Sequence, residues 1–203
     1  HLEQAGIEVR HEASGSQVAA RKVSELGRNG DIVMTADYRI VDWLLVPEFA
    51  AWQILFAANE IVIAHSEHSR YSAELTADNW REILTRDDVR VGRADENLAP
   101  IGYRTLIVWQ LSDIEAGVAT TDTEHGVAGR LRERIPPALV KPDVNDLAGL
   151  LGTQVDYVFL YRSIAHEHNL KYVRLPESIN LSDLERAEDY ARASVTIEKS
   201  TRG

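Results

Sequence analysis

The sequence predicts an α/β fold of two lobes, with mixed sheets flanked by helices and a central cleft between the lobes. Short β-prone runs alternate with helical segments in two blocks, which are joined around residues 57–66 and again near Pro176. A length of 203 residues is ample to bury a core. We therefore expect residues 1–63 to form the first part of lobe 1, residues 64–174 to form lobe 2, and residues 175–203 to return to lobe 1.

The first block opens with a polar turn and a helix. Ser16 is a suitable N-cap, because apolar residues follow it at i, i+4 and i+7 of one helical face. A helix over residues 38–45 should end before Pro47. The strands expected in this block are residues 6–10, residues 31–36 and two apolar runs within residues 53–64.

The second block carries more helices and shorter strands. Its strands are expected at residues 90–92, 155–161, 171–175 and 195–198. Its helices are expected at residues 76–84, from Tyr103 onward, at 143–151, at 163–168 and at 182–192.

The composition excludes several classes of protein. The net charge of −10 argues against a nucleic-acid partner, whose affinity comes mainly from cations on phosphates. Without cysteine, there can be neither a disulfide framework nor thiolate chemistry. No apolar run approaches the roughly 20 residues that span a bilayer.

Two turns that lead into helices could bind an anion. Ser14, Gly15 and Ser16 would offer hydroxyls and free backbone N–H groups at a helix start, although an ordinary serine N-cap is the favoured explanation of this segment taken alone. In the turn that begins at Ala99, the groups offered are the backbone at Gly102, the hydroxyls of Tyr103 and Thr105, and the guanidinium of Arg104. A surface arginine in a turn is the alternative there. Two such helix starts in two lobes favour an oxyanion held between them.

Catalytic and metal sites lack their usual signals. His65 and His68 have a spacing that could suit a metal on a helix, but His166 and His168 would point to different faces, and no third ligand lies near either pair. A nucleophile elbow, a P-loop and a Gly-x-Gly-x-x-Gly motif are all missing from the sequence. We therefore expect no catalytic residues, no cofactor and no metal site; an enzyme that uses the histidines remains an alternative.

Several stretches, spread in order over most of the chain, resemble the tungstate/molybdate-binding proteins of ABC importers, in the archaeal-type branch. They are residues 12–16, 36–38, 47–52, 58–64, 102–105, 156–163 and 168–172. The resemblance implies a two-lobed type II solute-binding fold that holds an oxyanion in its cleft. It also implies family segments that precede residue 1 and follow residue 203.

The family carries an Asp and a Glu that coordinate the metal of the oxyanion, and here these positions are Ala99 and Leu160. A carboxylate repels an oxyanion unless it bonds to the central metal, so their loss favours a simple tetrahedral dianion held by N–H, hydroxyl and Arg donors. The ligand-binding residues that we expect are Ser14, Gly15, Ser16, Gly102, Tyr103, Arg104 and Tyr161.

The resemblance implies a monomeric, extracellular or periplasmic protein, anchored to the membrane, if at all, by a segment outside this sequence. Its partners would be a small oxyanion, such as molybdate, tungstate or sulfate, and the membrane permease of an ABC importer. The alternative is an effector-binding or degenerate sensor module of the same fold with a different small ligand.

Overall fold

The computed structural model describes residues 6, 8–119, 122 and 124–197, which fold as a mixed α/β structure. The predicted α/β class, with a mixed sheet flanked by helices, is confirmed. The elements in chain order are α1 (Ser16–Ser24), α2 (Tyr38–Leu44), β1 (Ile61–His65), α3 (Trp80–Leu84), β2 (Val91–Ala94), α4 (Pro100–Glu115), α5 (Val127–Arg134), η2 (Pro137–Leu139), β3 (Val140–Lys141), α6 (Val144–Ala148), β4 (Tyr157–Tyr161), α7 (Arg162–Glu167), β5 (Lys171–Arg174), η3 (Leu184–Arg186) and α8 (Ala187–Tyr190).

One five-stranded sheet organises most of the chain, in the order β3-β2-β4-β1-β5. β1 pairs antiparallel with β4 and β5, while β2 pairs parallel with β4 and β3. Every residue of β1, β2 and β4 is buried, which explains why these strands are near-continuous apolar runs. We call the described residues within 60–195, which include this sheet and the helices around it, the sheet body.

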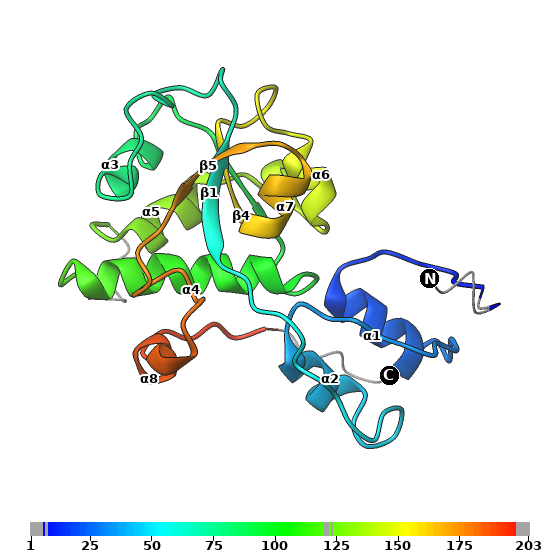
Figure 1. The fold of residues 1–203 in the computed structure, drawn as a ribbon. Coiled ribbons are helices and arrows are strands. Elements are labelled where there is room, and N and C mark those ends of the chain that lie inside the picture. Colours follow the sequence, from blue (N-terminus) through cyan, green and yellow to red (C-terminus); the bar gives the residue numbers. More distant parts are fainter. Residues whose placement is uncertain (1–5, 7, 120–121, 123, 198–203) are drawn as a thin grey trace.

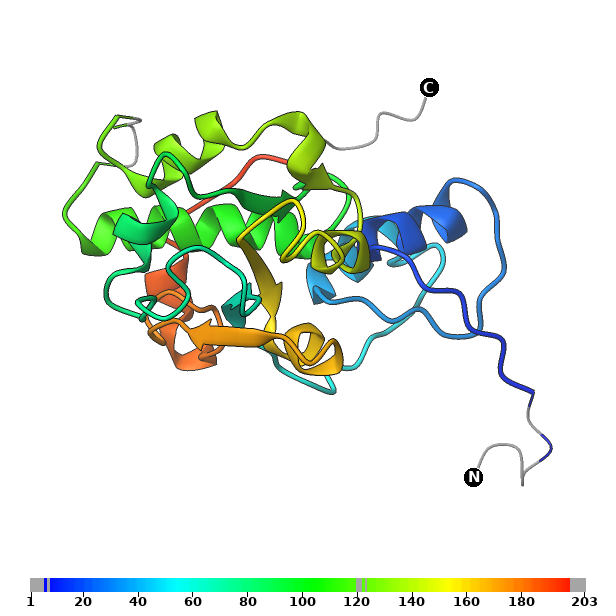
Figure 2. The same cartoon turned by 90° about the horizontal axis from the view of Figure 1, so that it is seen from above.

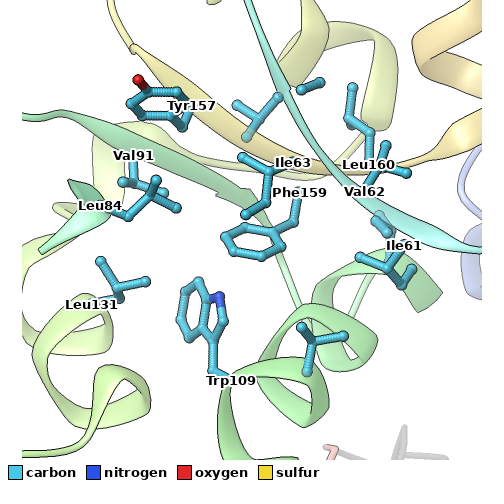
Figure 3. Close-up of a cluster of buried hydrophobic side chains, with 14 of the residues drawn as sticks. Ile61, Val62, Ile63, Leu84, Val91, Trp109, Leu131, Tyr157, Phe159 and Leu160 are labelled. Carbon is cyan, nitrogen blue, oxygen red and sulfur yellow. The ribbon is translucent and has the colours of Figure 1, made fainter. Parts of the chain in front are cut away.

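The core of the sheet body lies between the sheet and α4, which runs along one side of it (Figures 1 and 3). Phe159 in the middle of β4 meets two tryptophan rings, edge to face, at centroid distances of 5.7 Å to Trp80 and 5.6 Å to Trp109. Such pairs contribute beyond the apolar area that they bury. The large aromatic side chains therefore fix α3 and α4 against the sheet.

A second, smaller core holds α1 and α2 together. Ala20 of α1 and Ile40, Val41 and Leu45 in and after α2 are its buried residues. We call residues 14–50 the α1–α2 unit; both views show it at one end of the molecule, beside the sheet body (Figures 1 and 2). Trp43 and Trp52, in and just after this unit, are 57% and 73% exposed.

Several predicted strands do not form. Residues 8–10, 31–36, 53–57 and 195–197 have no strand hydrogen bonding within the described residues; Ile7 and Glu198, also in these predictions, lie outside them. A strand exists only beside a hydrogen-bonded neighbour, and apolar composition alone does not supply one. The exposed side chains of Ile32 and Ile54 show that these runs are not core strands here.

The predicted helices form, with shifted ends. Gly15 rather than Ser16 is the N-cap of α1, and α4 begins at Pro100, three residues before Tyr103, because proline fits the first turn of a helix. Three further predicted helices are shorter than expected: residues 76–84 become α3, residues 143–151 become α6, and residues 182–192 become η3 followed by α8.

Candidate functional site

The start of α1 lies directly against the loop before α4. A Cβ built on Gly15 would lie 2.8 Å from the backbone oxygen of Leu98 and 3.6 Å from that of Pro142. Only glycine therefore permits this approach. The contact brings together the two helix starts that the sequence singled out.

Two polar atoms at the start of α1 are buried without a hydrogen-bond partner in the described part of the chain. They are Oγ of Ser14 and Oε1 of Gln17, whose side chain is 3% exposed. Ser16, by contrast, is already engaged, because its Oγ accepts from the backbone N–H of Ala36 at 2.9 Å. A buried polar atom without a partner is costly, so Ser14 has hydrogen-bonding capacity that the protein itself does not use.

The start of α4 has its own backbone constraint. Gly102 in the first turn faces the carbonyl of Asp95 so closely that a Cβ would collide with it. Ala99 is the N-cap of α4 and supplies no side-chain hydrogen bond to the helix. No side chain caps this first turn, in which Pro100 has no N–H and the N–H of Gly102 donates to the carbonyl oxygen of Ala99 at 2.9 Å.

A buried polar network joins the α1–α2 unit to α4 and β4. The hydroxyl of Tyr103 donates to Oδ2 of Asp37 at 2.5 Å, and Nη2 of Arg104 lies 3.3 Å from the same oxygen. Nη1 of Arg104 donates to the hydroxyl of Tyr161 at 3.1 Å. Oδ1 of Asp37 accepts from the backbone N–H of Arg39, and so caps α2.

The environment fixes the charge of each group in this network. Burial raises the pKa of the Tyr103 phenol, and the neighbouring Asp37 carboxylate raises it further. Burial also raises the pKa of Tyr161, although Arg104 opposes that shift. Burial by itself would lower the pKa of the Arg104 guanidinium, but Tyr161 and Asp37 raise it, and their combined effect is larger. The two phenols therefore stay neutral donors, and Arg104 stays a cation.

The seven predicted site residues are drawn from three elements that meet here. Ser16 binds the backbone of Ala36, and the next residue, Asp37, contacts Tyr103 and Arg104. Arg104 in turn contacts Tyr161 at the end of β4. The remaining three, Ser14, Gly15 and Gly102, line the first turns of α1 and α4.

The two positions where the family pattern has carboxylates are apolar and closed to solvent. Ala99 is 3% exposed at the start of α4. Leu160 is fully buried in β4, where its register partner in β1 is Val62. Neither side chain can bond to a metal centre.

Asp37 belongs to this network but is not among the seven residues predicted from the sequence. An aspartate directly before a helix is most simply explained as an N-cap, and Asp37 does cap α2. Only its second oxygen, which faces Tyr103 and Arg104 across 66 and 67 positions of sequence, reveals the additional role. Residues 36–38 are one of the stretches that resemble the family, but no spacing in the sequence indicates that pairing.

The histidines do not converge on a metal. His65 is buried in β1, where its Nδ1 contacts the backbone oxygen of Ser66, and Nε2 of His168 contacts Asn145. Within the residues that the structure describes, no group of three or more His, Asp or Glu side chains could hold a metal ion.

One family model matches most of the chain. The family model described as bacterial extracellular solute-binding protein matches residues 3–197. No helix in the described ranges combines the length and the apolar character needed to cross a bilayer.

Relatives match nearly the whole chain. An uncharacterized solute-binding protein of Petrotoga mobilis is 43% identical over 193 residues, which cover 95% of this chain and 58% of the relative. The molybdate/tungstate-binding proteins WtpA of Thermococcus kodakarensis and Pyrococcus abyssi are 39% and 40% identical, over 94% and 95% of this chain and 58% and 61% of their own lengths. The chain thus spans about three-fifths of the length of the curated relatives it matches.

Proposed function

The chain belongs to the bacterial extracellular solute-binding proteins, and from this premise we propose that it captures a small tetrahedral oxyanion and delivers it to the permease of an ABC importer. Members of this family bind solutes and are not enzymes. The ions that we propose are molybdate, tungstate or a sulfate-like anion, because two relatives are named for molybdate and tungstate.

The observation that carries this proposal is the convergence on Arg104. Its guanidinium contacts Tyr161 and Asp37, beside Tyr103 on its own helix, and 24% of its side chain remains exposed. The neutral Tyr161 hydroxyl, backbone N–H groups at two helix starts and the Ser14 hydroxyl are the donors that a tetrahedral oxyanion needs, since the Tyr103 proton is donated to Asp37. One local cation can thus serve an anion even though the protein as a whole carries a charge of −10.

Coordination in the proposed site would remain tetrahedral. Expanding the shell of molybdenum or tungsten requires ligand oxygens, and Ala99 and Leu160 offer none at the two family positions. The ligand would therefore be bound by hydrogen bonds and charge alone.

The two-lobe division belongs to the same proposal. Residues 1–63 and 175–203 would form one lobe and residues 64–174 the other, with the oxyanion between the start of α1 and the start of α4. The separate core of the α1–α2 unit supports two lobes, although Ile61, Val62, Ile63, Leu175 and Ile179 pack in the core of the sheet body and not with that unit. We further propose that the protein acts as a monomer outside the cytoplasmic membrane.

A second candidate is a sensor or effector-binding module with a different small ligand. The observation that favours it is Asp37, whose carboxylate already occupies Arg104. A ligand with both a donor and an acceptor group would suit that pair better than a bare oxyanion would.

Isothermal titration of the full-length protein with molybdate, tungstate and sulfate tests the proposal. We expect saturable heat with at least one of them, and a loss of at least about tenfold in affinity in Arg104→Gln, since charge-assisted hydrogen bonds exceed 1.4 kcal/mol. Arg174→Gln is the matched control, because Arg174 pairs with Glu60 elsewhere on the sheet body. No heat with any of the three ions would refute the proposal.

A further inference from the structure

We propose that Asp37 is a charge-selectivity residue: its carboxylate lowers the affinity of the site for a tetrahedral dianion relative to a monoanion of the same shape. The inference rests on the proposed oxyanion site and specifies which anions that site favours. It assigns to Asp37 a role beyond capping α2.

The first step is the position of Asp37 relative to the cation of the site. Oδ2 of Asp37 lies 3.3 Å from Nη2 of Arg104, and the Asp37 side chain is 7% exposed. At this distance and depth, solvent screens the pair far less than it screens surface ion pairs. Asp37 therefore cancels most of the positive charge that Arg104 presents to an anion.

The second step is the charge of everything else around Arg104. Tyr103 and Tyr161 are neutral, and the start of α1 contributes serine hydroxyls and backbone groups. Arg39 lies over the Tyr38 ring and hydrogen-bonds the Asp37 carboxylate through its backbone N–H, and its guanidinium also interacts electrostatically with Asp37. Asp37 is thus the carboxylate that pairs with Arg104, and it also faces the charge of Arg39.

The third step is the consequence for a bound ion. An oxyanion at Arg104 must either share the guanidinium with Asp37 or take its place, and in both cases its charge is repelled by the carboxylate. The repulsion doubles from a monoanion to a dianion, whereas hydrogen bonds from Ser14, Tyr161 and the backbone depend mainly on shape. Asp37 therefore acts on the charge of the ligand and leaves its geometry to the other groups.

The test uses perrhenate and tungstate, two tetrahedral oxyanions of nearly equal size that carry one and two negative charges. Both are titrated into the wild-type full-length protein, Asp37→Asn and Asp37→Ser. Asn and Ser keep an N-cap acceptor for α2 and remove the charge, so a folded variant is available even if one of them fails. We expect the tungstate-to-perrhenate affinity ratio to rise about tenfold or more, as expected when one unit charge within about 8 Å is removed at an effective dielectric of about 20 to 30.

Asp156→Asn is the matched control, because Asp156 is a buried carboxylate paired with Arg70 at 2.8 Å, away from Arg104. Its affinity ratio should equal that of the wild type. If both ions bind and the ratio does not change in the Asp37 variants, the selectivity role is refuted while the oxyanion site stands. If neither ion, nor molybdate or sulfate, binds to the wild type or to either variant, the proposed function itself fails.

Discussion

The hydrogen bond from Tyr103 to Asp37 should be a measurable part of the stability of this protein. Tyr103→Phe removes only the hydroxyl, which lies 2.5 Å from Oδ2 of Asp37. Both side chains are buried, so water cannot replace the lost donor. Asp37 keeps Arg104 and the backbone N–H of Arg39 as partners, which limits the loss.

The expected magnitude follows from the type of bond. A hydrogen bond to a charged group contributes about 1.5 to 3 kcal/mol, and the two remaining partners place this one near about 2 kcal/mol. For a chain of this size, that is a fall in melting temperature of about 4 to 8 °C. In urea the unfolding midpoint should fall by about 1 M, at a slope of about 2 kcal/mol per molar.

Urea unfolding followed by far-UV circular dichroism measures this change. A double-mutant cycle with Asp37→Asn isolates the pair, and we expect the effect of Tyr103→Phe to shrink by at least half in that background. Tyr71→Phe is the matched control, because Tyr71 donates to Asp88 at 2.9 Å on the exposed surface and should cost under about 0.5 kcal/mol. Equal effects of Tyr103→Phe in both backgrounds would refute the reasoning.

Three further predictions follow from the same structure. In Gly15→Ala the new methyl group would separate α1 from the Leu98 carbonyl. We expect oxyanion affinity to fall at least about tenfold and the free energy of unfolding to fall by less than about 2 kcal/mol. An unchanged affinity in calorimetry would contradict this. Phe159→Ala should lower the free energy of unfolding by about 3 to 5 kcal/mol, since it empties the space between Trp80 and Trp109, and a loss below about 1 kcal/mol in urea would show that the core is not packed as described. Burial, and to a smaller extent the charge of Asp156, raises the pKa of Tyr157 from 10.0 to about 12. Between pH 10 and 12 only the unfolded chain loses this proton, so the free energy of unfolding should fall by about 1.4 kcal/mol per pH unit. Below pH 10 the residue is protonated in both states and adds no pH dependence. Tyr157→Phe should flatten that part of the profile, and an unchanged slope would exclude Tyr157 as its source.

The sequence predicted the sheet body better than the α1–α2 unit. The runs that became β1 and β4 are buried on both sides, and the apolar faces of α4 pack against them, so hydrophobic pattern and structure coincide. Residues 31–36 and 53–57 have the same apolar character and yet lack strand neighbours among the described residues. A strand forms only when it hydrogen-bonds to a neighbouring strand, and the composition of a segment does not show whether such a neighbour exists.

The parts of the candidate site that depend on local sequence patterns were predictable. The turns at Gly15 and Gly102 were visible because a glycine before a helix start is a local pattern. The burial of Ala99 and Leu160, and the carboxylate of Asp37 at Arg104, depend on which segments pack together in three dimensions. No spacing in the sequence encodes such contacts.

The four tryptophans form one buried pair and one exposed pair, and this difference provides intrinsic optical reporters. Trp80 and Trp109 are enclosed in the sheet body, while Trp43 and Trp52 are largely open to solvent in and beside the α1–α2 unit. Acrylamide should therefore quench one pair and spare the other, and the emission of the two pairs should differ in wavelength. A movement of the α1–α2 unit during solute capture can then be followed by light, without a label, as a change in the quenchable fraction.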